Sequence, residues 1–131
     1  MIKTVLGYDL EPGITETEYE RWLFDVHVPD ILANPHVDKL VFNKVIGKVE
    51  TISGGSMAIP DEMSFYRIAE MHFRDMSAYE AYRKWFAGHP IPDARSPKGR
   101  TRFRFYLVTE VVEVSQGTPG LNPSFLEGPV T

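Results

Sequence analysis

The order in which two hydrophobic periodicities alternate along the chain is what most constrains its fold. Alternating or β-branched apolar runs indicate four strands, at residues 1–10, 37–49, 64–75 and 100–114. Two segments with helical spacing of apolar residues follow Thr15 and Ser77. The order is therefore β-α-β-β-α-β, the split βαβ plan of ferredoxin-like α+β domains. It predicts a four-stranded antiparallel sheet with both helices on one face.

Short motifs predict where the two helices begin. The stretch "TETE" has the form of a capping box with Thr15 as N-cap, and "SAYE" repeats that form with Ser77 as N-cap. The dipeptide "NP" at Asn34 and Pro35 closes the first helix. The connection at 50–63 is long and irregular, as functional or mobile loops often are. We expect one domain over residues 1–114 and a Gly/Pro-rich tail over 115–131.

Composition excludes several classes of protein. The chain has 131 residues and no cysteine, which excludes disulfides, zinc–thiolate sites, iron–sulfur clusters and cysteine nucleophiles. The missing cysteines fit a cytoplasmic protein. A net charge of -4 does not favour nucleic-acid binding. No apolar run is long enough to span a membrane, and the first residues lack the apolar core of a signal peptide.

The stretch "DVHVPD" places a histidine beside a helix defect. Pro29 cannot donate a hydrogen bond to the carbonyl of Asp25, and it pushes Val28 away from helical angles. The helix should therefore kink or pause, which can turn His27 towards a cavity. His27 follows Leu23 by four positions, so we expect a partly shielded imidazole with a pKa near neutral pH. The alternative is a hydrogen-bonded histidine that only pins the kink.

The third predicted strand divides into two faces by its period of two. Phe65, Ala69, Met71 and Phe73 suit packing under helices, and the other set would face the open side, which is the prospective cavity. That other set comprises Tyr66, Ile68, Glu70, His72 and Arg74. Glu70 could hold His72 or a ligand there. The alternative is a polar network at a dimer interface.

Aromatic and amide side chains on several elements are candidates to line a pocket. They are Tyr8, Trp22, Asn43, Tyr66 and Tyr106. The fourth strand should present one face made of Arg102, Arg104, Tyr106, Val108 and Glu110. The second helix carries Tyr79, Tyr82, Trp85 and Phe86, which we interpret as core.

No motif in the sequence calls for a metal or a cofactor. There is no HExxH or His-x-His spacing, no phosphate-binding P-loop and no Gly-x-Ser-x-Gly nucleophile elbow. A metal site built from His27, Glu70 and His72 is geometrically possible, but no spacing supports it. We therefore expect a protein without a cofactor.

Several stretches resemble the EthD-like proteins of the dimeric α+β barrel superfamily. They are "MIKTVLGYDLEPGIT", "HVP" (27–29), "NP", "LVFN" (40–43), "AEMHFRDMSAYEAY" and "YLVTEVVEV". The likeness covers roughly residues 1–114, and the helix carrying His-x-Pro is its most specific part. The chain is also similar to small accessory proteins of prodigiosin-type pathways. The resemblance implies a dimeric barrel with a cavity, in a superfamily that includes cofactor-free cyclases, oxygenases, isomerases and lactone-handling enzymes.

These observations favour a homodimer that closes over the uncovered sheet faces and binds a small apolar ligand. The first hypothesis is a cofactor-free cyclase, dehydratase, isomerase or lyase acting on an aromatic or polyketide-like molecule. His27 would be the base or acid, with His72 and Glu70 as a partner pair. A cofactor-independent monooxygenase is a close variant, since it also needs a base and a dry pocket. A non-catalytic binding or accessory protein and a purely structural dimer are the alternatives.

Overall fold

The structure of the chain is a computed structural model that describes residues 1–60, 63 and 65–120. Three residues of the predicted 50–63 loop and third strand, 61, 62 and 64, lie outside the described residues. The last eleven residues of the predicted tail, 121–131, also lie outside them. Among the described residues, no helix has the length and apolar character that crossing a membrane requires.

Four strands form one antiparallel sheet. They are β1 (Ile2–Leu10), β2 (Lys39–Lys44), β3 (Arg67–Phe73) and β4 (Thr101–Glu110), in the spatial order β2-β3-β1-β4. The predicted ferredoxin-like α+β plan is therefore confirmed. The strands are shorter than predicted. For example, β2 ends at Lys44 because its neighbour β3 begins opposite, at Arg67.

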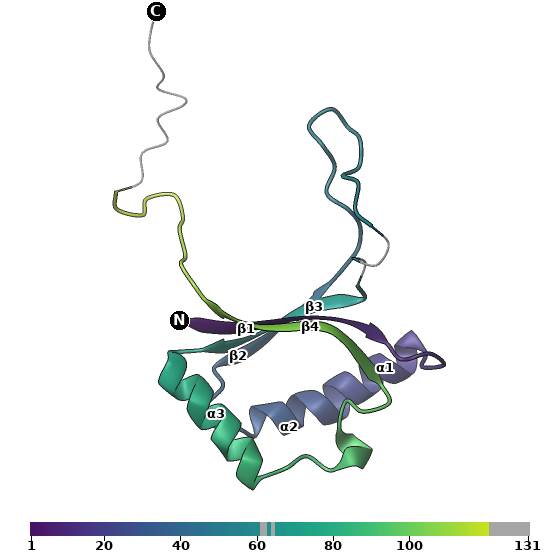
Figure 1. Cartoon of the computed structure of the whole chain (residues 1–131), viewed down its shortest axis with the longest axis vertical. Helices are drawn as coiled ribbons and strands as arrows, with labels where there is room; N and C mark the ends of the chain where they lie inside the picture. The colour runs from purple at the N-terminus through teal and green to yellow at the C-terminus, as the bar shows by residue number, and fades with distance from the viewer. Residues whose placement is uncertain (61–62, 64, 121–131) are drawn as a thin grey trace, which may run out of the picture.

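The helices cover one side of this sheet (Figure 1). The first helical segment comprises α1 (Glu16–Trp22), a π-helical turn (Leu23–His27) and α2 (Val28–Leu32). The second is α3 (Met76–Gly88), followed by a short 3-10 turn (Asp93–Arg95). Within the part of the chain that the structure describes, no helix lies on the opposite face of the sheet.

One of the two predicted helix caps is confirmed, and the other is wrong by two residues. The Oγ1 atom of Thr15 accepts a hydrogen bond from the amide of Glu18 at 3.1 Å. In the second helix the cap is Asp75, whose Oδ1 accepts from the amide of Ala78 at 2.8 Å. Ser77 therefore lies inside the first turn, because the carboxylate just before the helix already satisfies the exposed amide.

The core lies between the sheet and the helices. Ala69, Met71 and Phe73 are buried there, as their alternation predicts. The prediction is wrong for Phe65, which precedes β3 and contacts Phe105 of the open face, with ring centroids 5.4 Å apart. From β1 the buried set is Ile2, Thr4, Leu6 and Tyr8, and the helices add Tyr19, Trp22, Leu23, Ile31 and Tyr82. This arrangement explains the fold, since the strand faces with buried side chains are those under the helices.

Asn34 joins the two helical segments. It is almost completely buried, and its Nδ2 donates to the backbone carbonyl of Tyr82 in α3 at 3.0 Å. Its Oδ1 accepts from the amide of His36 at 2.9 Å, which turns the chain after the first helical segment. The "NP" signal therefore marks a buried connection as well as a helix end.

A β-bulge between β1 and β4 changes which side chains of β4 share a face. Gly7 lies opposite Phe105 and Tyr8 lies opposite Phe103, so β4 has one extra residue at Arg104. The predicted common face of Arg102, Arg104 and Tyr106 is therefore wrong. Tyr106 shares the helix-facing side with Phe103, while Phe105 lies on the open face over Gly7, where a Cβ would overlap its ring.

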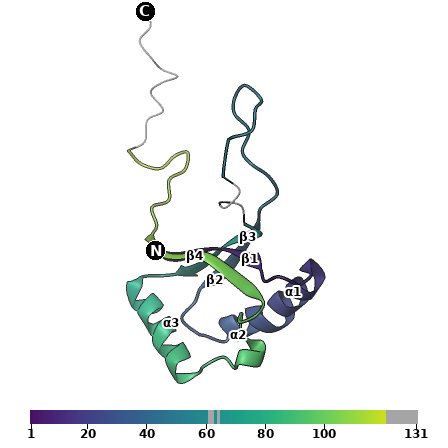
Figure 2. The same cartoon turned by 45° about the vertical axis from the view of Figure 1, so that its right-hand side comes forward.

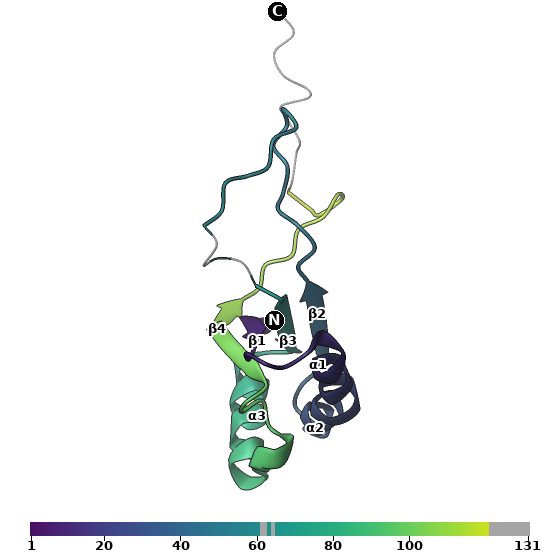
Figure 3. The same ribbon diagram turned by 90° about the vertical axis from the view of Figure 1, so that its right-hand side faces the viewer.

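Two segments extend from the sheet on the side away from the helices (Figures 2 and 3). Residues 45–60 follow β2, and residues 111–120 follow β4. The first segment folds back on itself through backbone hydrogen bonds from Thr51 to Gly55 and from Met57 to Val49. Nearly all described side chains of both segments are exposed.

Candidate active site

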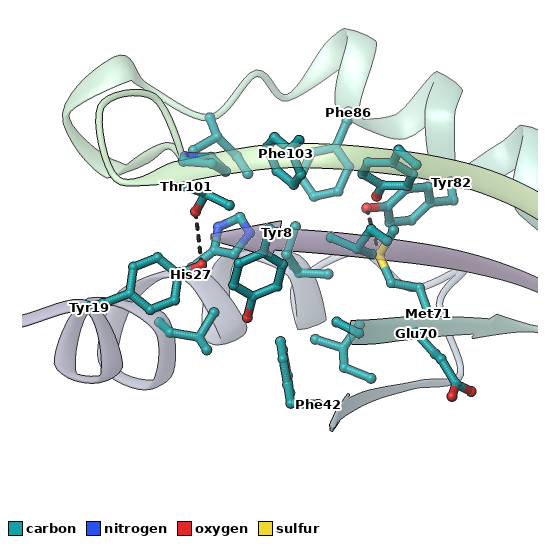
Figure 4. A pocket seen from close by; sticks show the side chains of 18 residues that line it. Tyr8, Tyr19, His27, Phe42, Glu70, Met71, Tyr82, Phe86, Thr101 and Phe103 are labelled. Atoms are coloured by element: carbon teal, nitrogen blue, oxygen red, sulfur yellow. Dashed lines mark hydrogen bonds between the residues drawn. The ribbon is translucent and has the colours of Figure 1, made fainter. Parts of the chain in front are cut away.

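A pocket of about 270 Å³ lies between the sheet and the helices of a single chain. Figure 4 shows its lining side chains, which come from all four strands, both helical segments and the loop before β4. The sequence placed the prospective cavity on the open face of the sheet. The structure places this pocket on the other face, because the bulged strands and the two helical segments leave the core incompletely filled there.

His27 enters this pocket from a π-helical turn. Its neighbour Val28 keeps helical angles (φ -58°, ψ -48°), and the amide of Val28 donates to the carbonyl of Leu23. The expectation that Val28 leaves the helical region is therefore wrong. The helix absorbs the missing amide of Pro29 by widening over one turn, which is a common device at functional sites. This extra residue in the turn re-aims His27 relative to a regular helix.

The imidazole of His27 is held without a charge. It stacks on the indole of Trp22 with ring centroids 4.7 Å apart and planes 16° apart. Burial lowers the pKa of His27 to about 4, although the Asp30 carboxylate acts in the opposite direction. The expected pKa near neutrality is thus corrected to a lower value. Nδ1 of His27 is buried and has no hydrogen-bond partner among the described residues.

A strap formed by residues 91–100 supports Trp22 and borders the pocket. The indole Nε1 of Trp22 donates to the carbonyl of Arg95 at 3.0 Å. The Arg95 guanidinium makes two hydrogen bonds of 2.9 Å to the carboxylate of Asp30 in α2. Trp22 itself does not line the pocket. Its predicted role in binding is therefore replaced by a supporting contact with His27.

Two tyrosine hydroxyls lie in the wall of the pocket. Tyr19 and Thr101 share a buried hydrogen bond of 2.8 Å between their hydroxyl oxygens. The Tyr8 hydroxyl is buried and makes no hydrogen bond of ordinary length with the described residues. Burial raises the pKa of Tyr8 and the pKa of Tyr19 above their ordinary value. Both phenols therefore remain protonated and can donate.

The remaining wall is largely apolar, apart from the hydroxyls of Tyr106 and of Tyr82, the second of which donates to Met71 Sδ at 3.4 Å. It includes Leu6, Leu23, Ile31, Phe42, Ala69 and Met71. Glu70 borders the pocket, but Figure 4 shows its carboxylate directed away from it. A molecule in this pocket would therefore meet neutral hydrogen-bonding groups and hydrocarbon, but no charged side chain.

The pocket opens along the edge strand β4. Among its lining residues, only Phe103 and Tyr106 are exposed, by 45% and 50%. Both side chains project from β4, which is an edge strand of the sheet that the described residues form. Tyr106, a predicted binding residue, thus lies at the mouth, while Tyr8 lies deep inside.

The predicted partner pair lies on the opposite face of the sheet. Glu70 accepts hydrogen bonds from Lys3 at 2.8 Å, His72 Nε2 at 2.9 Å and Asn43 at 3.3 Å. The Lys3 ammonium, with help from His72, holds the pKa of Glu70 below its usual range. The sheet therefore separates His27 from His72 and Glu70. The three cannot share one metal or one substrate within a chain. Asn43 also belongs to this open-face cluster.

Tyr66 lies with α1 and not with Glu70 and His72. Its hydroxyl donates to Glu20 of α1, which also accepts from Arg67 at 2.6 Å. Tyr66 precedes the first residue of β3, so the alternation of the strand does not extend to it. Its predicted role in lining the pocket is therefore corrected to a polar contact between the sheet and the first helical segment.

Sequence reasoning missed Tyr19, Thr101, Phe42 and Phe103 as pocket residues. Tyr19 was part of the apolar helix stripe, and nothing in the stripe distinguishes a core position from a pocket position. Tyr82 and Phe86, interpreted as core, also line the pocket. One signal was present for Thr101, since it is the hydroxyl residue that opens the fourth apolar run.

Within the described ranges, no three histidine or acidic side chains gather closely enough to hold a metal ion.

No family model matches the chain, and no curated protein matches it. Solved structures do match. HapK from Hahella chejuensis has 12% sequence identity to this chain and a TM-score of 0.57. The match covers 90% of this chain and 99% of the HapK chain. At3g17210 from Arabidopsis thaliana has 15% identity and a TM-score of 0.57, over 88% of this chain and 99% of its own.

The chain shares the fold of these two proteins. A third neighbour is an ethyl tert-butyl ether D (EthD) family protein from Bacillus halodurans. It has 15% identity and a TM-score of 0.48, over 86% of this chain and all of its own. Because the matches to HapK and At3g17210 include nearly the whole of those chains, the fold is shared over their full length.

Proposed function

We propose that the chain is a cofactor-free enzyme that moves protons on a small, uncharged, largely apolar carbonyl or aromatic compound. One observation carries this proposal. A neutral imidazole and the buried hydroxyl of Tyr8 enter one largely apolar pocket, and neither His27 Nδ1 nor Tyr8 Oη makes a hydrogen bond of ordinary length with the described residues. Buried polar atoms without partners cost free energy, and a bound ligand that pairs with them removes that cost.

The proposed chemistry follows from the states of these groups. Neutral His27 would remove a proton from a carbon beside a carbonyl. Tyr8 would donate a hydrogen bond to the oxygen that becomes negative, and Tyr19 lies beside it. With a pKa of about 4, the imidazole is a weak base in the empty pocket. The developing anion raises its basicity in this low-dielectric site.

A weak base restricts the substrate. It can take protons only from acidified carbons, such as one between two carbonyl groups or one whose deprotonation leads to an aromatic ring. Glu70 is the one charged residue of the described lining, and its carboxylate is directed away from the pocket, which favours neutral ligands over carboxylates. Cyclisation, dehydration, isomerisation and lyase steps all pass through such a proton transfer.

Deuterium exchange into a neutral β-diketone such as benzoylacetone tests this proposal. We expect the protein to accelerate exchange at the carbon between the carbonyls, as followed by NMR in deuterated buffer. His27→Asn should reduce the acceleration at least about a hundredfold, and Tyr8→Phe about tenfold or more. Binding of the diketone, followed by tryptophan fluorescence, should persist in both variants.

His89→Asn is the matched control. His89 also stacks on a tryptophan, Trp85, with ring centroids 4.1 Å apart, but it is exposed and does not line the pocket. Its exchange rate should equal that of the unmodified chain. Full activity of His27→Asn would contradict the proposal. Binding without acceleration in the unmodified chain would favour a carrier or accessory protein.

We also propose that the chain forms a homodimer through the open sheet face. That face carries Val5, Val41, Ile68, Phe105 and Leu107 beside the Glu70 cluster, as the strand register indicates. No element among the described residues covers these side chains. An apolar face of this kind, with its charges already paired, suits a second copy.

A further inference from the structure

The segment at 45–60, which we call the arm, carries apolar side chains that no other described residue covers. Ile46, Val49, Ile52 and Met57 are all exposed, and Ile52 is fully so. The arm rises from the open-face side of the sheet, away from the helices (Figure 3). A backbone hydrogen bond from Met57 to Val49 joins its two halves, so the arm is a hairpin-like loop whose tip lies near Ile52. A group of exposed apolar side chains indicates a missing partner surface.

The arm is long enough to pass a second sheet. Eight residues from 45 to the tip span roughly 25 Å at about 3.3 Å per residue. Two sheets that pack face to face lie about 10 Å apart. In a face-to-face dimer, the arm of one protomer would therefore reach beyond the sheet of its partner to the level of the partner's helices, where the pocket lies.

The register of the sheet indicates which part of the partner the arm meets. Lys44, the last residue of β2, pairs with Arg67, which pairs with Tyr8, which pairs with Phe103 of β4. The root of the arm and Phe103 therefore lie in one row across the sheet. β2 and β4 are the two edges. A two-fold axis parallel to the strands places β2 of one protomer opposite β4 of its partner, and it leaves the row at the same position along the strands. It therefore brings each arm to the partner's Phe103.

The alternative axis, across the strands, would bring the arm to the partner's β2. The chemistry of the two edges favours β4. On its helix-facing side, β4 exposes Phe103, Tyr106 and Val108. On the same side, β2 exposes Lys44, while Leu40 and Phe42 are half-buried. An apolar arm buries more apolar surface against the first set.

We propose that the arm of each protomer packs along β4 of the partner and covers the mouth of the partner's pocket. This inference rests on the homodimer of the proposed function. The pocket would then be completed by a second chain, whose Ile52 region would contact the ligand side of Phe103 and Tyr106. Ligand access would depend on the dimer, and water would be excluded from His27 by a residue of the partner.

Cysteine cross-linking tests this proposal directly, because the natural chain has no cysteine. Single variants Ile52→Cys and Phe103→Cys are mixed, joined with a short bismaleimide and resolved by intact mass. We expect a covalent heterodimer in high yield. Ile52→Cys mixed with Lys39→Cys is the matched control on the other edge, and it should remain largely unlinked. Ile52→Ser, which removes no contact within the chain, should weaken dimerisation at least about tenfold.

The outcomes separate this inference from the dimer itself. A dimer that links through Lys39, or through neither position, overturns the arm contact and leaves the open-face dimer standing. A monomer by light scattering overturns both. Heterodimer formation through Phe103 together with a weaker Ile52→Ser dimer supports the proposal. A dimer that forms equally well with Ile52→Ser contradicts it.

Discussion

At the scale of single residues, the environment of His27 determines what the imidazole can do. The ring lies on Trp22 inside the pocket wall, and its nearest acid, Asp30, is engaged by Arg95. Among the described residues, no carboxylate hydrogen-bonds to this imidazole, in contrast to His72, which contacts Glu70. Neutral His27 suits proton transfer with a ligand, whereas His72 is part of a fixed polar cluster.

The low pKa of His27 predicts a loss of stability in acid. The unfolded chain binds a proton at His27 with a pKa near 6.5, and the folded chain only near 4. The contribution of His27 to the free energy of unfolding is therefore fully present well above pH 6.5 and is lost as the pH drops towards 4. The loss is about 2 kcal/mol between pH 7.5 and pH 5. Urea unfolding at the two pH values measures this loss.

His27→Gln should lose less stability over the same interval, because glutamine does not titrate. His89→Gln serves as the control and should keep the full acid sensitivity of the natural chain. If His27→Gln and the natural chain lose stability equally, the imidazole is not buried in the way described.

At the scale of the elements, two local devices aim the pocket residues. The π-turn at Leu23–His27 absorbs Pro29 without breaking the helix. The bulge opposite Gly7 and Tyr8 returns Phe103 to the helix-facing side, so that it lines the pocket with Tyr106. Each device inserts one residue into a regular element, and each changes which side chains point into the pocket.

The start of α3 gives a prediction that distinguishes two caps. Asp75→Ala should lower the free energy of unfolding by about 1 kcal/mol, because it removes the acceptor for the amide of Ala78. Ser77→Ala should change it by much less, since Ser77 lies within the first turn. Thermal or urea unfolding of both variants measures the difference. Equal costs would place the helix start elsewhere.

At the scale of the whole molecule, the sheet divides the chain into two unlike faces. One holds the helices and the pocket, and the other holds paired charges, an apolar patch and the roots of the two extended segments (Figure 1). The proposed dimer buries the second face. It would leave the pockets on the outer sides of the two sheets, each close to the partner's arm.

The proposed dimer predicts different effects for two exposed leucines. Leu107 is 57% exposed on the open face, and Leu32 is 51% exposed on α2. Leu107→Asp should weaken dimerisation at least about tenfold, because it would place an unpaired charge in the interface. Leu32→Asp should leave the dimer unchanged.

Analytical ultracentrifugation over a range of concentrations measures this effect, and circular dichroism checks that both variants fold. An equally stable Leu107→Asp dimer would show that the open face is not the interface. Equal weakening by Leu32→Asp would place the interface on the helical side.

By itself, the sequence determined the order of elements, the first helix cap and the buried face of β3. These depend on local chemistry and on periodicity, which each segment carries alone. It also singled out His27, Tyr8 and Tyr106, which line the pocket. The tertiary structure decided the face on which the pocket lies, and it separated His72, Glu70 and Asn43 from that pocket.

The physical reason is that one inserted residue reverses a strand face or rotates a helix. No local pattern records where a bulge or a π-turn will be placed. Those positions depend on how β4 pairs with β1 and how the first helical segment packs on the sheet. The pKa of His27 has the same origin, since the burial that lowers it comes from Trp22, the strap and the sheet together.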